Sequence, residues 1–410
     1  MRERISAVIR KRSIRSLIAL DYTHASEKLS SLGDTFILSA MNSQDSYSTW
    51  VEVDLGAIED NVRYFLQSTG RQFMAVVKAE AYGHGAIQIA KTACKAGASW
   101  LGVARAGEAL ELRAAGIDEP IFLLGWTPPA RMDELIKANV SMAFWSEAQL
   151  ADISRAAEKV DSRANVHLKI DTGMSRVGVK PEEASRLAQE AGRIPAVHLE
   201  GVFTHFAKAD ESESASTASQ LRMFGEIVSS WESSGLRPPL VHCANSAAAL
   251  RRPEAWYDLV RVGIAMYGLH PSSVCKLPGV VRPALTWKSR LSQVKVLPPG
   301  RGVSYGHIYT TTSEERIGTI PVGYADGFRR VEGNEVLVGG KRVPVVGRVT
   351  MDQIMVQLDA LPGAQPGDEV VIIGSQEAER ISAEDVADRW GTINYEVTSG
   401  IMKRVPRVYT

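Results

Sequence analysis

Short apolar runs alternate with amphipathic segments from about Arg71 to about Leu269. The apolar runs predict buried strands of a parallel sheet: Met74–Lys78, Trp100–Ala104, Ile121–Leu124, Ser141–Phe144, Val166–Ile170, His198–Phe203, Leu240–Cys243 and Asp258–Val262. Between most of them, apolar residues at three- and four-residue spacing predict helices: Ala86–Ala96, Ala106–Ala115, Ala130–Ala138, Glu147–Glu158, Pro181–Ala191 and Gln220–Ser233. This alternation over roughly 200 residues predicts a (β/α)₈ TIM-like barrel. An open doubly wound sheet is the alternative, but no G-x-G-x-x-G loop follows the first strand.

The pattern changes after about Pro283, where strand-like runs replace the helical ones. These runs are Ser292–Val296, Arg316–Pro321, Glu335–Val338, Arg342–Val346, Gln353–Leu358 and Glu369–Ile373, with one short helix at Ser382–Trp390. Gly339-Gly340 between two of the runs indicates a hairpin. We therefore expect an α/β chain with a barrel over residues 49–285 and a mainly β domain over residues 286–410. A strand at Trp50–Leu55 precedes the barrel and could pair with the β-domain.

Residues 1–48 differ from the rest and are interpreted as a disordered or loosely attached N-terminal extension. Several arginines precede a short apolar patch, Leu17–Leu20, and an Arg-rich transit segment is the weaker alternative. Met41 lies just before the first strong strand, so we hypothesise that it is the natural start. Mass spectrometry of the native N-terminus tests this, since a protein that begins at Met1 would contradict it.

Composition narrows the classes of function. The chain of 410 residues carries 47 Lys+Arg against 47 Asp+Glu, which argues against nucleic acid or a membrane surface as the main partner. Its cysteines, Cys94, Cys243 and Cys275, show no C-x-x-C spacing, so neither a disulfide framework nor a metal site is indicated. We expect a cytoplasmic protein. No apolar run reaches the roughly 18 residues of a membrane-spanning helix.

Lys78 ends the first apolar run of the predicted barrel and is followed by a glycine-flanked turn. A lysine there would lie at the rim of a dry interior, where desolvation favours the neutral, nucleophilic amine. This is the environment that a Schiff-base lysine needs. A lysine that simply reaches into solvent is the competing interpretation of this segment.

The loops after the seventh and eighth strands are where barrels commonly bind phosphate. Ser246 opens a short helix-like stretch there, and Gly263 allows backbone N–H groups to approach closely. An ordinary helix N-cap and a tight turn are the alternatives. Together with Lys78, a phosphate site suggests pyridoxal 5′-phosphate (PLP). Arg261 on the eighth strand would face the ring nitrogen, or else form an internal ion pair, and His205 is either a neighbour in the mouth or structural.

Ordered motifs from Trp50 to Thr410 then identify a family. They are Val76–Gly85, Lys169–Gly178, Gly201–Phe206, Ala244–Ala247, Val260–Leu269, Val303–Gly306, Ile320–Gly327, Gly347–Gln353 and Ile393–Val397. With these motifs the chain closely resembles the alanine racemase family, which are fold-type III PLP enzymes. The resemblance implies a racemase that interconverts L- and D-alanine and supplies D-alanine for peptidoglycan.

The resemblance also implies a role for each matching residue. Lys78 would be the PLP lysine and one catalytic base, and Tyr305 the other. In the family this tyrosine reaches the barrel of the partner subunit, which implies a head-to-tail homodimer with composite active sites. Arg261 would pair with the pyridine nitrogen, and the phosphate ligands would be Tyr82, Ser246, Gly263, Ile264 and Tyr395. A lysine and a tyrosine both titrate at about 10, so each must be shifted toward the working pH.

The remaining implied roles concern the substrate. Arg176 and the backbone N–H of Met351 would face its carboxylate, and Lys169 matches a lysine that is often carbamylated and suited to hold the arginine. His205 would link Tyr305 to Arg261. A narrow entry formed by Tyr324 and Tyr395 would favour a small amino acid.

Two positions depart from the family pattern, and several readings of function compete. Glu80 stands where Asn or Asp is usual, and if it faced the site it would raise the pKa of Lys78. Thr350 stands where Cys or Ser is frequent. A serine, lysine or broad-specificity racemase therefore remains an alternative. A decarboxylase of the same architecture needs an acidic ring partner and a later cysteine, and a non-catalytic PLP-binding protein would lack the second domain.

Overall fold

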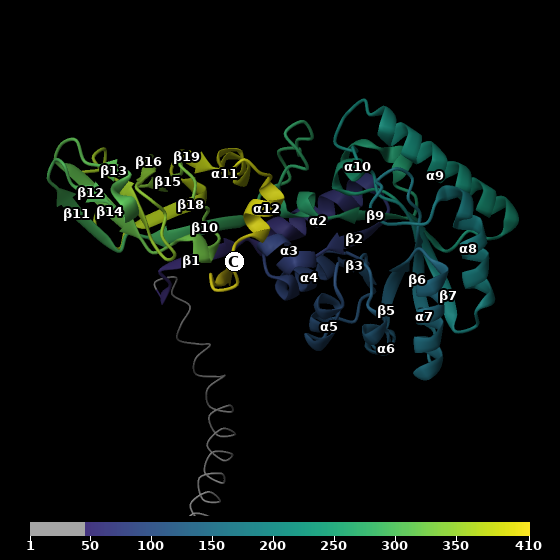
Figure 1. Cartoon of the computed structure of the whole chain (residues 1–410). Helices are drawn as coiled ribbons and strands as arrows, with labels where there is room; N and C mark the ends of the chain where they lie inside the picture. Colours follow the sequence, from purple (N-terminus) through teal and green to yellow (C-terminus); the bar gives the residue numbers. More distant parts are fainter. Residues whose placement is uncertain (1–45) are drawn as a thin grey trace, which may run out of the picture. The chain divides into compact units, whose positions relative to one another are not determined.

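The computed structural model describes residues 46–410, and its first element is the strand β1 (Thr49–Val53). Eight parallel strands form a barrel in the order β8-β7-β6-β5-β4-β3-β2-β9 (Figure 1). Their bounds are β2 (Gln72–Val76), β3 (Trp100–Val103), β4 (Ile121–Leu123), β5 (Val140–Phe144), β6 (Ala164–Lys169), β7 (Val197–Phe203), β8 (Leu240–His242) and β9 (Leu259–Val262). Backbone hydrogen bonds from Asp258 to Val241 and from Arg261 to Ala244 join the last two strands. The predicted barrel is thus confirmed.

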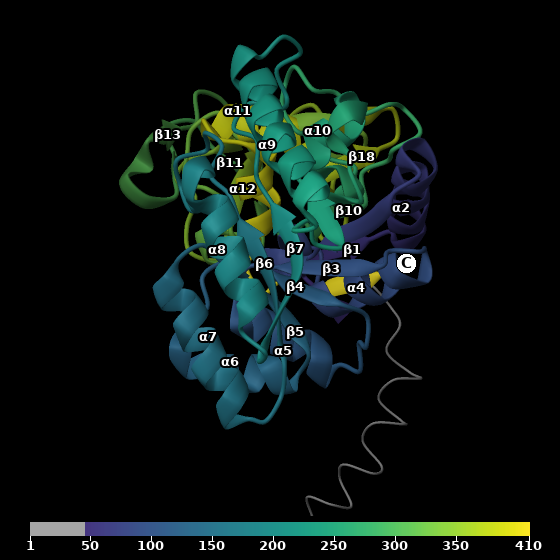
Figure 2. The same ribbon diagram turned by 90° about the vertical axis from the view of Figure 1, so that its right-hand side faces the viewer.

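Helices alternate with these strands and pack on their outer side (Figure 2). They are α4 (Ala86–Lys95), α5 (Ala106–Ala114), α6 (Pro129–Lys137), α7 (Glu147–Lys159), α8 (Pro181–Arg193), α9 (Ala215–Ser234) and α10 (Ser246–Arg251). All six predicted helices appear within a few residues of their expected bounds. A further helix, α2 (Leu55–Thr69), was not predicted. It begins after the cap Asp54, whose side chain accepts the Ala57 N–H, and ends at Gly70 with φ +62°.

The barrel interior is filled by large side chains from successive strands. Met74, Trp100, Phe122 and Phe203 are all at most 6% exposed and form one cluster inside the ring. The opposite faces of the same strands pack against the helices, as Phe73 and Ala75 do on β2. Strands buried on both faces explain why the sequence shows continuous apolar runs there.

The chain from Leu285 onward, together with β1, forms a second sheet in the order β11-β14-β17-β16-β15-β18-β10-β1-β20. These strands are β10 (Leu285–Arg290), β11 (Gln293–Leu297), β14 (Glu315–Ile320), β15 (Glu335–Val338), β16 (Lys341–Val346), β17 (Ile354–Gln357), β18 (Glu369–Gln376) and β20 (Arg407–Tyr409), with β19 (Glu379–Ile381) paired to β18. Gly339 and Gly340, both at positive φ, form the predicted hairpin turn. The mainly β character is therefore confirmed.

The first strand belongs to this second sheet, as the sequence suggested. β1 pairs antiparallel with β10 and parallel with β20. The predicted helix is α11 (Ala383–Trp390), but a second helix, α12 (Asn394–Ser399), was missed, as were β10 and β20. None of the helices in residues 46–410 is long and apolar enough to cross a membrane. The hypothesis on Met41 concerns a residue outside the described range. Of the N-terminal extension over residues 1–48, only residues 46–48 lie within that range.

Candidate active site

A cavity of about 690 Å³ opens at the carboxyl ends of the barrel strands. Ten of the predicted site residues line it: Lys78, Tyr82, Lys169, Arg176, His205, Ser246, Arg261, Gly263, Ile264 and Tyr395. Lys169 and Arg261 lie on the fifth and eighth barrel strands, and the others come from the segments after the first, fifth, sixth, seventh and eighth strands and from α12. This is the end of a barrel where chemistry is normally found. The structure therefore brings together residues that are more than 300 positions apart in the chain.

Lys78 stands at the start of an unusual left-handed turn. The predicted strand ended at Lys78, but β2 ends at Val76, and α3 (Lys78–Gly83) follows directly. Inside it, Ala79, Glu80, Ala81 and Tyr82 all have φ between +51° and +55°. Each non-glycine residue in this region costs roughly 1–2 kcal/mol, so surrounding contacts must impose the turn.

Glu108 is one of the groups that hold this turn in place. Its Oε1 accepts the Ala79 N–H at 2.7 Å, and its Oε2 accepts the N–H groups of Ala104 and Arg105 at 2.8 and 3.0 Å. The carboxylate thus ties the loop that carries Lys78 to the start of α5. Sequence reasoning missed this role, because Glu108 and Ala79 are 29 positions apart and no local pattern links them.

The amine of Lys78 is in the electrostatic state that the sequence suggested. Burial lowers its pKa, the charge of Arg176 lowers the pKa further, and Glu108 acts in the opposite direction. A larger fraction of the amine is therefore neutral and nucleophilic at neutral pH than for a lysine in water.

Ser246 and Gly263 form a compact arrangement on the opposite rim. The Ser246 hydroxyl accepts the N–H groups of Gly263 at 3.0 Å and Ala265 at 3.4 Å. Ser246 is not the N-cap of α10, which is Asn245, whose side chain accepts the Ala248 N–H. A Cβ on Gly263 would lie 2.5 Å from the Tyr82 hydroxyl. Only glycine leaves room for this close approach, so the tight-turn alternative does not explain the position.

Aromatic rings close the cavity beside the left-handed turn. The Tyr82 ring lies 5.0 Å from Tyr267 and 6.1 Å from Tyr395, measured between centroids. Burial raises the pKa of both Tyr82 and Tyr395, so their hydroxyls remain protonated hydrogen-bond donors. Tyr395 donates to the Pro271 carbonyl at 3.3 Å. Tyr267 was not predicted, and its hydroxyl bonds the Val76 carbonyl just before the lysine.

Arg261 is buried at the base of the cavity. Its Nη2 lies 2.9 Å from the Thr204 carbonyl and 3.2 Å from His205 Nδ1, and its Nη1 lies 3.1 Å from His242 Nδ1. Burial lowers the pKa of Arg261 to about 10, which leaves it charged at neutral pH. No carboxylate pairs with it directly among residues 46–410, so the ion-pair alternative does not hold. Burial and then Arg261 hold the pKa of His205 well below its usual range, so this imidazole is neutral.

Lys169 is buried and has no hydrogen-bond partner for its Nζ among residues 46–410. The amine lies 4.7 Å from the centroid of the Phe203 ring. Burial, then the charges of Arg261 and Arg176, hold its pKa well below the usual range. A buried amine without a partner, whose pKa is lowered by the charges of two arginines, marks a position where an anion would be stabilised.

Three predicted residues do not line this cavity. Tyr305, in the turn η4 (Tyr305–His307), is 71% exposed, Tyr324 in η5 (Tyr324–Asp326) is 46% exposed and Met351 is 52% exposed. Tyr305 and Tyr324 share a hollow on the β-domain with Thr350. The residue before Tyr305, Ser304, has φ +62°, and its hydroxyl bonds the Arg348 carbonyl at 2.6 Å. The tyrosine is thus presented on a constrained surface loop.

Comparison with known proteins places this arrangement in a family. The profile of the alanine racemase N-terminal domain matches residues 53–271, and that of the C-terminal domain matches residues 284–409. The chain belongs to the alanine racemase family. It is 45% identical to alanine racemase of Desulfovibrio desulfuricans over 364 residues, which covers 88% of this chain and 97% of the relative. It is 48% identical to that of Geobacillus stearothermophilus over 368 residues, or 88% and 93%.

Solved structures agree with this membership. An alanine racemase from Clostridium difficile 630 superposes with a TM-score of 0.85 at 39% identity, covering 89% of this chain and 96% of that one. The Bacillus anthracis alanine racemase with bound L-Ala-P gives a TM-score of 0.84 at 42% identity, covering 88% and 95%. The barrel followed by a β-domain is therefore the architecture of this family.

Glu80 and Thr350 are the two positions at which this member departs from the racemase motifs. Glu80 does not face Lys78 in the way that would raise its pKa. Its carboxylate forms an ion pair with Lys403 at 2.5 Å, just before the last strand. Thr350 bonds the Gln353 carbonyl at 2.8 Å through its hydroxyl. Glu80 therefore supports the turn from outside the cavity.

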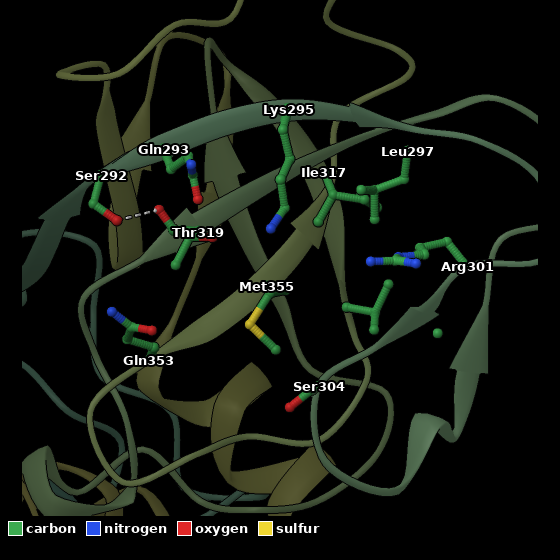
Figure 3. Close-up of a pocket in the computed structure, with 12 residues that line it drawn as sticks. Ser292, Gln293, Lys295, Leu297, Arg301, Ser304, Ile317, Thr319, Gln353 and Met355 are labelled. Atoms are coloured by element: carbon green, nitrogen blue, oxygen red, sulfur yellow. Dashed lines mark hydrogen bonds between the residues drawn. The ribbon is translucent and has the colours of Figure 1, made fainter.

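A second cavity, of about 600 Å³, lies on the β-domain of this racemase (Figure 3). Its lining residues come from β11, β14 and β17 and from β12 (Gly302–Val303), which pairs with β13 (Tyr309–Thr310), and they include Lys295 and Arg301. None of the predicted site residues lines it, and no carboxylate or histidine does either. This second cavity is therefore not the candidate active site.

Proposed function

We propose that this chain is a PLP-dependent alanine racemase that interconverts L- and D-alanine. The observation that carries the proposal is that the desolvated Lys78 and the Ser246–Gly263 rim open into one cavity above the buried Arg261. A neutral lysine suits an aldehyde, backbone N–H groups suit a phosphate, and an arginine suits an unprotonated ring nitrogen.

The residues of the cavity fit PLP in shape as well as in chemistry. The absence of a Cβ at Gly263 lets the Tyr82 hydroxyl approach the backbone at this rim, since a Cβ there would lie 2.5 Å from it. The Ser246 hydroxyl already gathers two backbone N–H groups at this rim. Tyr82, Ser246, Gly263, Ile264 and Tyr395 would hold the phosphate, and Lys78 would bind the aldehyde carbon.

Two bases on opposite faces of the substrate explain racemisation. Bound PLP would delocalise the electron pair left at Cα when its proton is removed. Lys78 Nζ would remove or return the proton on one face, because burial favours its neutral form. Tyr305 of the partner subunit would serve the other face. His205 accepts the Arg261 N–H at Nδ1, at 3.2 Å, so its Nε2–H would donate a hydrogen bond to the hydroxyl oxygen of that tyrosine.

The proposed homodimer follows from where Tyr305, Tyr324 and Met351 lie. All three are exposed on the β-domain, away from the cavity that holds Lys78. A head-to-tail dimer would bring these residues to the barrel mouth of the second subunit. The Met351 N–H and Arg176 would then face the substrate carboxylate, and Tyr324 with Tyr395 would limit substrate size.

The environment of Lys169 favours carbamylation of its amine at the base of the site. The amine is buried and unpaired, and its lowered pKa favours the neutral form, whose nitrogen would bond to the carbon of carbon dioxide and release one proton to solvent. The resulting anion would lie between Arg261 and Arg176, whose charges already act on it. A charge-assisted hydrogen bond from the carbamate would orient the Arg176 guanidinium toward the substrate.

We further propose that the reaction occurs in the cytoplasm, where it would supply D-alanine for peptidoglycan. The three cysteines, Cys94, Cys243 and Cys275, are free, in keeping with a reducing compartment. We retain the division into an extension over residues 1–48, a barrel over residues 49–285 and a β-domain over residues 286–410.

Incubation with PLP in D₂O tests the proposed function. L-Alanine, L-serine and L-lysine are supplied separately, and optical rotation and α-deuterium are followed together. We expect L-alanine to lose optical rotation and gain deuterium at Cα fastest. A faster reaction of serine or lysine would move the substrate assignment to those amino acids. Unchanged optical rotation with all three would overturn the racemase proposal.

A further inference from the structure

A row of polar side chains runs through the barrel beneath the cavity. Arg261 Nη1 lies 3.1 Å from His242 Nδ1, and His242 Nε2 lies 2.8 Å from His167 Nδ1. His167 Nε2 then lies 3.1 Å from Glu200 Oε2, which also accepts the Ser141 hydroxyl at 2.5 Å. The residues come from β9, β8, β6, β7 and β5. The barrel core therefore contains a continuous hydrogen-bonded path from Arg261 to a carboxylate.

The direction of every bond in this path follows from its two ends. A guanidinium only donates, so His242 accepts at Nδ1 and carries its proton on Nε2. His167 must then accept at Nδ1 and carry its proton on Nε2, which it donates to the Glu200 carboxylate. Burial lowers the pKa of both imidazoles, so both are neutral. One protonation pattern satisfies all three contacts.

The backbone is shaped to bring Glu200 into this position. The register between β6 and β7 pairs Val166 with Leu199 and His167 with Gly201, so Glu200 is the extra residue of a bulge. A bulge redirects a side chain that strand alternation would place on the other face. A Cβ on Gly201 would lie 2.5 Å from His167 Nδ1, so this glycine makes room for the ring.

The two imidazoles are fixed by aromatic packing. His167 stacks on Phe122 with centroids 4.2 Å apart, and His242 stacks on Phe203 at 5.1 Å. Both histidines are fully buried. Rings held in this way keep their nitrogens aimed along the path, and neither histidine faces the catalytic cavity.

We propose that Glu200 is the counter-charge of Arg261 and that His167 and His242 are positioning residues that connect the two. A buried guanidinium requires compensation, and among residues 46–410 no carboxylate pairs with Arg261 directly. The path occupies Nη1, while the Thr204 and Cys243 carbonyls accept from Nη2, so the guanidinium plane is fixed from both sides. The orientation of the guanidinium toward a bound PLP ring would be fixed as well. This inference rests on the proposed function for its catalytic consequence, but the protonation pattern does not.

Nuclear magnetic resonance of the PLP-free protein tests the pattern directly. In ¹⁵N-histidine-labelled protein, an N–H···N bond couples the two ring nitrogens and so identifies the His167–His242 pair. We expect both rings to be neutral with the proton on Nε2. A proton on Nδ1 of either ring, or a doubly protonated ring at neutral pH, would overturn the proposal.

Two substitutions of Glu200 separate charge from hydrogen bonding. Glu200→Gln keeps the shape and an acceptor but removes the charge, whereas Glu200→Asp keeps the charge on a shorter side chain. We expect the glutamine variant to bind PLP with a changed absorbance and to lose about tenfold in kcat with little change in KM. The aspartate variant should retain more activity than the glutamine variant.

The reverse order of the two variants would show a packing role and overturn the proposal, as would wild-type absorbance and kcat in Glu200→Gln. Ser141→Ala is the matched control, because it removes one hydrogen bond to Glu200 and leaves the charge. If the glutamine variant fails to fold, the wild-type resonances still decide. Absence of racemisation in the wild type would refute the proposed function and leave the protonation pattern to be judged by itself.

Discussion

The barrel mouth and the surface around Tyr305 hold their reactive groups in opposite ways. Lys78 lies in a cavity formed within one chain, where Glu108 holds its loop and the Ser246 hydroxyl accepts the facing Gly263 N–H. Tyr305 is 71% exposed on a short strained loop. The first region is a cavity lined by residues of one chain, whereas the second is an exposed surface.

This difference suggests how the two proposed bases, Lys78 and Tyr305, would be tuned. The properties of Lys78 are set by burial within its own subunit, so they exist before any partner arrives. Tyr305 can acquire a comparable environment only from another surface. Oligomerisation would then control one face of the reaction and leave the other face unchanged.

Lys78→Ala gives the largest expected effect, because it removes both the covalent attachment and one base. We expect racemisation to fall by at least about 10⁴-fold. Mass spectrometry after borohydride reduction should find no PLP attached to the variant. Lys91→Ala, on the exposed face of α4, is the control and should remain labelled at Lys78. PLP trapped on the Lys78→Ala chain would contradict the assignment.

Tyr305→Phe should have the next largest effect and probes the exposed surface around Tyr305. We expect racemisation to fall about 10²–10³-fold, because one proton donor is lost. Deuterium should still enter one enantiomer through Lys78, and PLP binding should persist. Tyr47→Phe, another exposed tyrosine, is the control. Equal loss of exchange and PLP binding would refute the proposed role.

Mixing the Lys78→Ala and Tyr305→Phe proteins sharpens the comparison further. A mixed dimer would contain one site with both substitutions and one intact site. Random reassociation should therefore restore about a quarter of the wild-type activity. If the two bases came from the same subunit, no activity would return.

Lys169→Met probes the buried amine that has no partner. In bicarbonate-free buffer we expect the PLP-free variant to be about 1–3 kcal/mol more stable than wild type in urea unfolding, since it removes an unsatisfied buried group. The folded pKa of Lys169 lies below its unfolded value, so the wild type gains stability as pH rises toward about 10. The difference in unfolding free energy between the variant and the wild type should therefore narrow as the pH rises. It should also narrow with added bicarbonate if a carbamate forms on Lys169. Lys91→Met should show neither trend.

Glu108→Gln is expected to have the smallest effect. It tests whether the Glu108 carboxylate contributes to the pKa of Lys78 within the barrel mouth. The carboxylate raises the pKa of Lys78, so its removal should lower that pKa further. The rate of PLP uptake by PLP-free protein, followed across pH, should rise at lower pH than in wild type. We expect kcat to change less than about tenfold, because the amide still accepts one N–H. Glu111→Gln, on the same helix, should leave the profile unchanged.

Much of this molecule could be predicted from sequence, for identifiable physical reasons. Strands buried on both faces, such as Phe73–Val76, leave continuous apolar runs that mark a barrel. The helix α2 was missed although Ile58, Val62 and Phe65 form an apolar stripe. Its start follows so closely on β1 that the two merge in the pattern.

The residues of the cavity could be named in advance, but the forces that place them could not. Positive φ at Ala79–Tyr82 contradicts local preference and is imposed by contacts distant in the chain. The bulge at Glu200 reverses the alternation that a strand pattern assumes. Glu108 carries no sign in the sequence of its bond to Ala79.

The left-handed turn has a consequence for how the protein matures. Arg407, near the end of the chain, donates to the Gly83 carbonyl at 3.0 Å, and the turn also packs against Thr398 and Tyr409. During synthesis the barrel strands emerge well before these residues. We therefore expect the turn that carries Lys78 to be fully supported only after the last strand has left the ribosome.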